Sequence, residues 1–224
     1  MQSHQLPVTR TARYSSLGPE AGAVSELWIV LHGYAQLSAR FLRDFAVLEN
    51  GTTAIVAPEA LSRFYLETGL DGRHGERVGA TWLTREDREA DLADHLRYLD
   101  ELLRHLMDGF GAWRPRLSVL GFSQGSVMAA RWVAAGTIHP ERLLLWGTPL
   151  PRDLPPEAFA PRLGATAVTF VAGAEDPFVP AGSIEGNAAA LAALGVLARV
   201  SRFVGGHAID PAALLAAAGR TAEA

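Results

Sequence analysis

The sequence predicts an α/β protein in which a mostly parallel sheet is flanked by helices. Short runs rich in β-branched residues and leucine alternate along the chain with longer amphipathic runs, a pattern typical of βαβ units. No internal repeat and no linker interrupts this alternation. We therefore expect the 224 residues, of which 49% are hydrophobic, to form one doubly wound domain over residues 1–224.

Six runs are expected to form strands, because each is short and rich in β-branched residues or leucine. These runs are residues 27–31, 52–57, 116–122, 142–146, 167–172 and 198–204. A further strand is expected early in the chain, near residues 8–15.

Helices are expected where apolar side chains recur at helical spacing. They cover residues 38–48, 84–106, 123–135, 184–194 and 211–217. The second of these opens with Thr84 and, three residues later, Asp87, which resembles a capping box.

Two stretches are expected to be loops because they show neither period. Residues 59–82 are rich in glycine and charge, and a loop of that length is usually functional. Residues 148–164 contain five prolines and are too short to fold into a large lid. The sequence therefore predicts an open site without a separate cap.

The amino-acid composition excludes several classes of protein. The chain contains no cysteine and no lysine, since all 20 basic residues are arginine. These absences exclude disulfides, thiolate metal sites, cysteine nucleophiles, pyridoxal phosphate and the lysine-containing phosphate loop. A net charge of −4 without a basic stretch argues against nucleic-acid binding. With no secretory signal or membrane-spanning run evident, we expect a cytoplasmic protein without stable membrane insertion.

The strongest chemical signal is the Gly-Phe-Ser-Gln-Gly run at residues 121–125. A predicted strand precedes it and a predicted helix follows it. In a G-x-S-x-G turn of this kind the serine oxygen is exposed at the sheet edge, while the glycines allow close backbone approach. The positive end of the helix dipole also favours negative charge near Ser123. Ser123 is therefore the predicted nucleophile.

An acid and a histidine follow Ser123 in the order that this chemistry requires. Asp176 lies just after the fifth predicted strand, and His207 lies just after the sixth. Because the carboxyl ends of parallel strands meet at one edge of a sheet, all three would lie together. The imidazole would remove the serine proton, and the carboxylate would fix the imidazole tautomer. Glu175 is a second candidate for the acid.

Two backbone N–H groups are candidates for an oxyanion hole. Tyr34 follows the first buried strand through His32 and Gly33, and Gln124 follows the nucleophile. These are the two places from which such a fold supplies its donors. The His32 side chain is expected to be buried and bonded to loop backbone.

No metal site and no cofactor are expected. Asp91 and His95 lie one helical turn apart, which is a ligand spacing, but such a pair is more often a surface pair. The other histidines lack neighbours at ligand spacing.

The sequence resembles the phospholipase/carboxylesterase family of α/β-hydrolases, which includes the acyl-protein thioesterases. The matching runs are Val-Leu-His-Gly at 30–33, Gly-Phe-Ser-Gln-Gly at 121–125, Gly-x-x-Asp-x-x-Val-Pro at 173–180 and Gly-His at 206–207. The resemblance implies cofactor-free ester or thioester hydrolysis, with Ser123 as nucleophile, His207 as general base and Asp176 as its orienting acid. It likewise implies Tyr34 and Gln124 as the oxyanion donors.

The sequence departs from the better-known thioesterases at two places. Tyr-Ala-Gln at 34–36 stands where those proteins often carry an apolar residue followed by Gly-Asp, and residues 62–82 are distinct. These departures bear on the substrate more than on the chemistry. The candidate pocket residues near the site in loop order are Phe64, Tyr65, Trp82, Phe178 and Val179.

These observations predict a serine carboxylesterase that hydrolyses short- to medium-chain carboxylic esters of small molecules through an acyl-enzyme. A thioesterase or lysophospholipase acting on acyl-protein or acyl-lipid is the alternative. The same triad also serves the cleavage of other bonds to an acyl group, including amide and carbon–carbon bonds. A non-catalytic binding protein on the same fold is a third hypothesis. The oligomeric state is left open, with a homodimer among the options.

Overall fold

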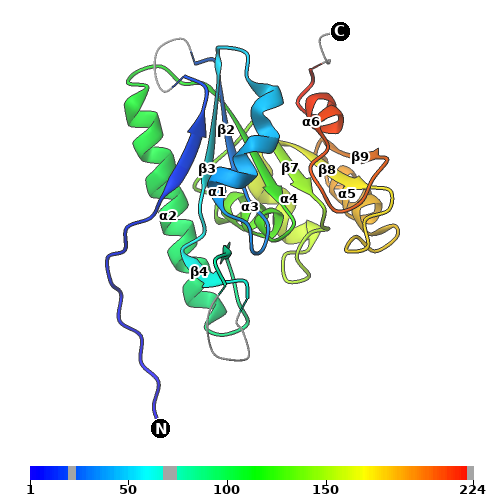
Figure 1. Ribbon diagram of the computed structural model, residues 1–224. Helices are drawn as coiled ribbons and strands as arrows, with labels where there is room; N and C mark the ends of the chain where they lie inside the picture. The colour runs from blue at the N-terminus through cyan, green and yellow to red at the C-terminus, as the bar shows by residue number, and fades with distance from the viewer. Residues whose placement is uncertain (20–23, 68–74, 221–224) are drawn as a thin grey trace.

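The computed structural model describes residues 1–19, 24–67 and 75–220. The strands of its large sheet are β1 (Tyr14–Leu17), β2 (Glu26–Leu31), β3 (Thr53–Pro58), β6 (Arg116–Phe122), β7 (Arg142–Trp146), β8 (Ala167–Gly173) and β9 (Ala198–Phe203). Within the described residues they form a seven-stranded sheet in the order β1-β3-β2-β6-β7-β8-β9 (Figure 1). All neighbours pair in parallel except β1, which runs antiparallel to β3 at the edge. The predicted mostly parallel sheet is confirmed.

The six predicted strands are all present, with ends that differ by at most one residue. The early strand was expected near residues 8–15 and instead spans Tyr14–Leu17, because its ladder partners are Ile55 to Pro58 at the edge of β3. The chain before it lies against a helix, where the Tyr98 hydroxyl donates to the carbonyl of Arg13.

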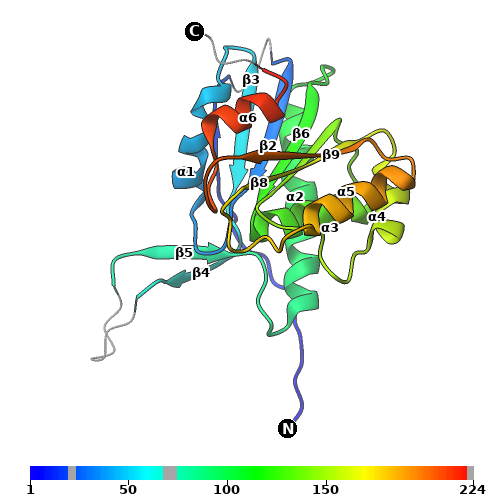
Figure 2. The same cartoon turned by 90° about the vertical axis from the view of Figure 1, so that its right-hand side faces the viewer.

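Helices cover both faces of the sheet. They are α1 (Ser38–Phe41), the 3₁₀ helix η1 (Leu42–Leu48), α2 (Arg88–Gly109), α3 (Gln124–Ala135), α4 (Pro156–Leu163), α5 (Ser183–Ala193) and α6 (Pro211–Ala217). The core on one face takes buried side chains from α2 to α5, and the core on the other takes them from α1, η1 and α6. Figures 1 and 2 show α2 and α6 on opposite sides of the strands. The expected doubly wound arrangement is present.

The predicted start of the long helix is wrong by four residues, because Thr84 does not cap it. The Thr84 hydroxyl donates to the carbonyl of Glu86 within a turn. Asp87 has a left-handed backbone with φ 49°, and its carboxylate accepts from the Gln5 amide at 2.7 Å. The helix therefore begins at Arg88.

Three expected segments have more varied structure than predicted. Residues 38–48 form only one α-helical turn before the backbone tightens into η1. Residues 148–164 contain α4, which begins at Pro156, where a proline costs no hydrogen bond. Residues 59–82 contain an antiparallel pair, β4 (Ser62–Tyr65) and β5 (Val78–Thr81), which Figure 2 shows extending away from the large sheet. Residues 68–74 of that expected loop lie outside the described residues.

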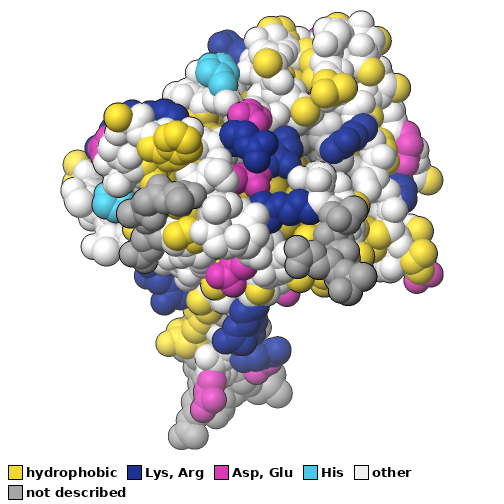
Figure 3. All heavy atoms as spheres, turned by 90° about the horizontal axis from the view of Figure 1, so that it is seen from above, with side chains coloured by type: hydrophobic (Ala, Val, Ile, Leu, Met, Phe, Trp, Pro, Cys, Tyr) yellow, Lys and Arg dark blue, Asp and Glu magenta, His cyan; other side chains and the backbone are white. Residues whose placement is uncertain are grey.

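At the amino ends of the parallel strands, a buried carboxylate holds the C-terminal segment to the sheet. Glu26 is 2% exposed and forms ion pairs with Arg142 and Arg220. Arg220 also donates to the carbonyl of Leu48 and to the hydroxyl of Thr53. Figure 3 views this end of the molecule and shows arginine side chains gathered near its centre. The opposite end of the sheet, at the carboxyl ends of the strands, is therefore left for the site.

Candidate active site

The predicted nucleophile lies in a strained turn between β6 and α3. Ser123 has φ 53° and ψ −117°, a conformation that L-residues rarely adopt and that costs on the order of 1–3 kcal/mol. The turn is compact, since a Cβ at Gly121 would lie 2.3 Å from the Gly125 carbonyl oxygen, and one at Gly125 would lie 2.1 Å from that of Leu31. Only glycine fits at these two positions, and the turn has the geometry of a nucleophile elbow.

The predicted histidine and acid are hydrogen-bonded to each other. His207 Nδ1 lies 2.7 Å from Asp176 Oδ2, and the other oxygen of Asp176 accepts the Phe178 N–H at 2.9 Å. The Asp176 side chain is only 1% exposed, whereas that of His207 is 17% exposed. With Nδ1 directed to a buried carboxylate, Nε2 is the ring nitrogen left to exchange a proton.

Aromatic rings hold the imidazole in place from two sides. The Phe122 ring centroid lies 4.7 Å from that of His207, and the Phe178 ring packs edge-on at 4.8 Å. Gly147 lies behind the pair, where a Cβ would come within 2.8 Å of His207 Cε1. The position of the imidazole is thus set by packing as well as by its hydrogen bond.

Ser123 and His207 line one pocket of about 410 Å³ at the carboxyl edge of the sheet. Its other described lining residues are Gly33, Tyr34, Gln36, Phe122 and Phe178. Tyr34 and Phe178 are 59% and 69% exposed, so the pocket opens to solvent between two aromatic rims. The loops after β2, β6, β8 and β9 all contribute to it, as expected for such a sheet.

The two predicted oxyanion donors come from the loop after β2 and from the first residue of α3. Among the hydrogen bonds of the described residues, none uses the backbone N–H of Tyr34 or of Gln124. In the same loop the Gly33 N–H is occupied by the Gln36 side chain at 2.7 Å. The N–H groups of Tyr34 and Gln124 are therefore without a partner among the described residues, as a donor to a bound oxyanion would be.

The five predicted pocket residues are placed differently from one another. Phe178 lines the pocket, and Phe64 stacks against the Tyr34 ring at 5.3 Å between centroids. Tyr65 is exposed on β4, on the solvent side of the hairpin. Trp82 and Val179 are buried in the core, and the Trp82 indole N–H donates to the His32 carbonyl.

Three residues of the site were not singled out from the sequence. Gln36 and Phe122 both line the pocket, and Gly147 packs behind His207. Phe122 adjoins the predicted nucleophile, which was a usable signal. Gln36 and Gly147 had no such signal, because their roles arise from contacts with residues distant in the sequence.

Two histidines near the site are buried and structural. His32 accepts the Ala60 N–H through Nε2 at 3.1 Å, and His95 accepts the Leu61 N–H at 2.9 Å. Burial lowers the pKa of His32 to about 4 and lowers the pKa of His95 as well. His95 was expected to form a surface pair with Asp91 and is instead 1% exposed, with Nδ1 bonded to the Asp91 carbonyl.

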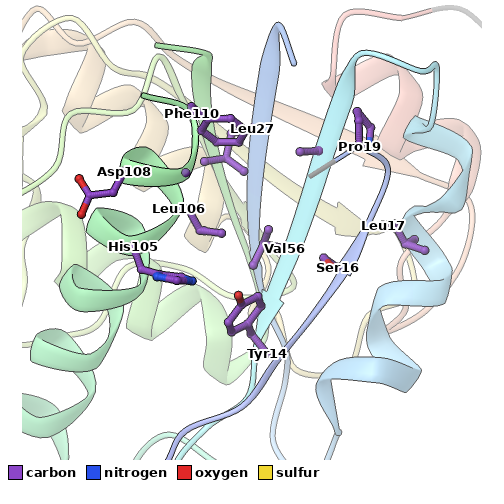
Figure 4. A pocket seen from close by; sticks show the side chains of 12 residues that line it. Tyr14, Ser16, Leu17, Pro19, Leu27, Val56, His105, Leu106, Asp108 and Phe110 are labelled. Atoms are coloured by element: carbon purple, nitrogen blue, oxygen red, sulfur yellow. The ribbon is translucent and has the colours of Figure 1, made fainter. Parts of the chain in front are cut away.

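A second cavity, of about 370 Å³, shares no residue with the first. It lies between α2 and the edge strands, with Tyr14 and His105 at one end and Phe110 at the other (Figure 4). Its walls include the apolar residues Leu27 and Val56. This cavity contains no serine elbow, and among the hydrogen bonds of the described residues none joins the His105 and Asp108 side chains that line it. The first pocket is therefore the candidate active site.

The described residues are also informative about metals and membranes. No three of their histidine, aspartate or glutamate side chains gather closely enough to hold a metal ion. Within the same residues, no helix combines the length and apolar character needed to cross a membrane.

A parallel sheet of this order, with a strained serine at a strand–helix turn and a histidine in the same pocket, defines an α/β-hydrolase of the serine type. Residues 28–213 match the model of the FSH1 serine hydrolase family, and the chain belongs to that family. It is therefore a serine hydrolase. A comparison with curated proteins gives no match.

Several solved structures are similar over nearly the whole chain. Esterase PE8 is 25% identical with a TM-score of 0.64, and the match covers 94% of this chain and 98% of that one. Acyl-protein thioesterase 2 from Zea mays is 19% identical with a TM-score of 0.65, covering 91% and 95%. A phospholipase/carboxylesterase from Dyadobacter fermentans is 16% identical with a TM-score of 0.61, covering 93% and 96%. The resemblance inferred from the motifs is confirmed.

Proposed function

We propose that this serine hydrolase is a carboxylesterase that cleaves short- to medium-chain carboxylic esters through an acyl-enzyme, using Ser123, His207 and Asp176 as a triad. The observation that carries the proposal is the hydrogen bond of 2.7 Å between His207 and the buried Asp176, with His207 lining the same pocket as Ser123. The similarity to esterase PE8 supports the same reaction class.

In the proposed acylation step, Ser123 Oγ attacks the ester carbonyl carbon while His207 Nε2 takes the serine proton. The carbonyl π pair becomes an oxyanion, which accepts from the N–H groups of Tyr34 and Gln124. When the tetrahedral intermediate collapses, the C–O bond to the alcohol breaks and His207 returns the proton to the leaving oxygen. Each oxyanion donor contributes about 10²–10³ in turnover in such sites.

In the proposed deacylation step, water takes the place of the alcohol. His207 removes a proton from that water, whose oxygen attacks the acyl carbon, and the bond to Ser123 Oγ then breaks as the serine recovers its proton. Asp176 stays ionised throughout, holding the tautomer of His207 and stabilising its transient cation. The proposed reaction uses these side chains, the two backbone N–H groups and water.

The substrate range is proposed from the pocket. A volume of about 410 Å³ is at the small end for ligand sites, and its two rims are exposed aromatic rings. A short or medium acyl chain fits such a pocket, whereas a long chain would lie mostly in solvent. Because the pocket opens to solvent, we expect the enzyme to hydrolyse dissolved ester molecules without a lag that disappears when the substrate forms micelles.

The test is hydrolysis of p-nitrophenyl esters from acetate to palmitate by the wild type, Ser123→Ala and Ser25→Ala. Ser25 is an exposed serine at the other end of the sheet and serves as the matched control. We expect the rate of hydrolysis to be highest for short or medium acyl chains. This activity should be lost in Ser123→Ala and kept in Ser25→Ala. Labelling by a fluorophosphonate probe should follow the same pattern.

Two results would overturn parts of the proposal. Near-wild-type activity or probe labelling in a folded Ser123→Ala variant would remove Ser123 as the nucleophile. A probe-reactive wild type that cleaves acyl thioesters much faster than every oxygen ester would replace the carboxylesterase by a thioesterase.

A further inference from the structure

The loop that carries the first oxyanion donor is bonded to the β4–β5 hairpin. The Ala35 N–H donates to the Ala80 carbonyl at 2.9 Å, and the Ala80 N–H donates to the Gln36 carbonyl at 3.1 Å. This isolated antiparallel bridge lies directly after Tyr34. Ala35 has φ 65°, a conformation that an alanine keeps only when its surroundings impose it. The hairpin therefore constrains the backbone that presents the Tyr34 N–H.

The side chain of Gln36 sets the direction of the same loop from within. Its Oε1 accepts the Gly33 N–H at 2.7 Å, while the backbone N–H of Gln36 donates to the Gly33 carbonyl at 3.3 Å. The N–H groups of Gly33 and Ala35 are both bonded, whereas that of Tyr34, the pocket-lining residue between them, has no partner among the described residues. Without the Gln36 side-chain amide, the Gly33 N–H would lose its partner and would compete with the Tyr34 N–H for a negative charge in the pocket.

The second donor is tied to the same hairpin by a second glutamine. Gln124 Oε1 accepts from the Thr81 hydroxyl at 3.1 Å and from the Trp82 N–H at 2.9 Å. Its Nε2 donates to the Leu83 carbonyl at 2.8 Å. All three polar contacts are with β5 or the residues immediately after it. The residue that supplies the second N–H is thus anchored by its own side chain to the strand that anchors the first.

The contact between β5 and the first loop leaves no room for a side chain. A Cβ at Gly79 would lie 2.5 Å from the carbonyl oxygen and 2.7 Å from the Cα of Ala35. On the neighbouring strand, Phe64 stacks against the Tyr34 ring at the pocket rim. One hairpin therefore touches both oxyanion loops and one wall of the pocket.

We infer that the β4–β5 hairpin is a positioning element of the oxyanion hole, acting on Tyr34 through Gln36 and Ala80 and on Gln124 through its side-chain amide. Gln36 and Gln124 are positioning residues in this role, because their side chains act through backbone N–H groups. The inference rests on the proposed acyl-transfer function and goes beyond it by giving a positioning role to two side chains and a hairpin outside the triad. Its consequence is that the hairpin controls turnover more than substrate affinity.

The experiment compares Gln36→Met and Gln124→Met, which keep side-chain length and remove the amide. On the p-nitrophenyl ester that the wild type cleaves best, we expect kcat to fall about tenfold or more, with KM within about threefold. A trifluoromethyl ketone with the same acyl chain is the second probe. Addition of Ser123 Oγ to its carbonyl carbon, with the proton passing to His207, creates an oxyanion that depends on the hole. Its inhibition constant should rise in proportion to the loss of kcat/KM.

The hairpin itself is tested with Gly79→Ala, paired with Gly186→Ala as the control. Gly186 lies in α5, where a Cβ would have nothing within 4 Å, so alanine there should leave kcat unchanged. We expect Gly79→Ala to lower kcat and ketone affinity together. Thermal unfolding of every variant shows whether a loss of activity comes from a loss of folded protein. If Gly79→Ala does not fold, Gln36→Met and Gln124→Met decide the test.

The possible results separate the two proposals. If Ser123→Ala keeps activity, the proposed function fails. If Ser123→Ala is inactive while both methionine variants keep wild-type kcat and ketone affinity, the hairpin inference alone fails. A rise in KM with unchanged kcat, or a loss of kcat with unchanged ketone affinity, would also overturn the inference.

Discussion

His207 Nδ1 lies 2.7 Å from Asp176 Oδ2, and the aspartate side chain is almost wholly buried beneath the exposed loop that carries it. The neighbouring Glu175 is exposed on the same loop, and the chain order alone left it open which of the two was the acid. The hydrogen bond and the burial together favour Asp176.

We expect Asp176→Asn to lower kcat by about 10³–10⁴, because an amide at this position no longer selects the tautomer that leaves Nε2 free to accept the serine proton. The measurement is steady-state ester hydrolysis at pH 7 to 8. Glu175→Gln is the matched control and should change kcat by less than about twofold. The reverse pattern, with Glu175 essential and Asp176 dispensable, would assign the acid to Glu175.

We expect Gly147→Ala to lower kcat by about tenfold or more, because the new methyl group would press within 2.8 Å of His207 Cε1. Gly147 has φ +74°, so alanine also adds backbone strain of about 1–2 kcal/mol. Gly51→Ala isolates that strain, since Gly51 has φ +77° and a Cβ there would have nothing within 4 Å. Both variants should lose thermal stability, and only Gly147→Ala should lose turnover. Equal kcat in the two variants would show that contact with His207 is irrelevant.

We expect acid to destabilise the fold through its buried histidines. Burial lowers the folded-state pKa of His32 to about 4, below the unfolded value near 6.5. Between pH 4 and pH 6.5 the unfolded chain therefore binds more protons than the folded chain. The contribution of His32 to the free energy of unfolding is fully present above pH 6.5 and is lost as the pH falls toward 4. The whole effect of His32 is about 3 kcal/mol, and His95 shifts in the same direction.

The measurement is urea unfolding of the wild type and of His32→Asn between pH 7 and pH 5. Asparagine keeps a hydrogen-bonding side-chain amide but does not titrate, so the deficit of the variant in unfolding free energy against the wild type should shrink as the pH falls. A deficit that is constant across this range would contradict the assignment. The window stops at pH 5 because carboxylates titrate below it.

We expect Glu26→Ala to lower the free energy of unfolding by about 3–5 kcal/mol, because it leaves Arg142 and Arg220 partly buried without their carboxylate. Turnover per folded molecule should stay within about twofold of the wild type, since Glu26 lies at the amino end of β2 and the pocket lies beyond its carboxyl end. Urea unfolding and active-site titration with the fluorophosphonate probe measure the two quantities. A loss of specific turnover in the folded fraction would mean that the two ends of the sheet are coupled.

The fold class and most of the strands were predictable because β2, β7 and β8 are largely apolar runs, most of whose residues are buried. Leu27, Val30 and Val119 are all fully buried, and their pattern carries that burial in the sequence itself. The β4–β5 hairpin was missed for the opposite reason. Its strands are only four residues long, and β5 is mostly buried without being rich in large apolar residues. Their place is set by the contact between Ala80 and the loop at Gln36.

Trp82 shows why the residues that line a pocket are hard to predict from loop order. A tryptophan near the site in loop order is a reasonable candidate for a pocket wall, yet Trp82 is fully buried between the rings of His32 and His95. Its indole N–H donates a hydrogen bond to the His32 carbonyl, so this polar group has its partner inside the core. Loop order gives proximity along the chain, but it does not give the side of the loop on which a large ring packs.

The sequence by itself determined the alternation of strands and helices, the serine turn, and the order of serine, acid and histidine, because these are recorded in local periodicity and in short motifs. Only the tertiary structure decided that Asp176 holds His207, that Phe178 and Tyr34 form the pocket rims, and that Gln36 and Gln124 meet the same hairpin. These depend on contacts between segments tens of residues apart, and such contacts exist only once the sheet has brought its strand ends together.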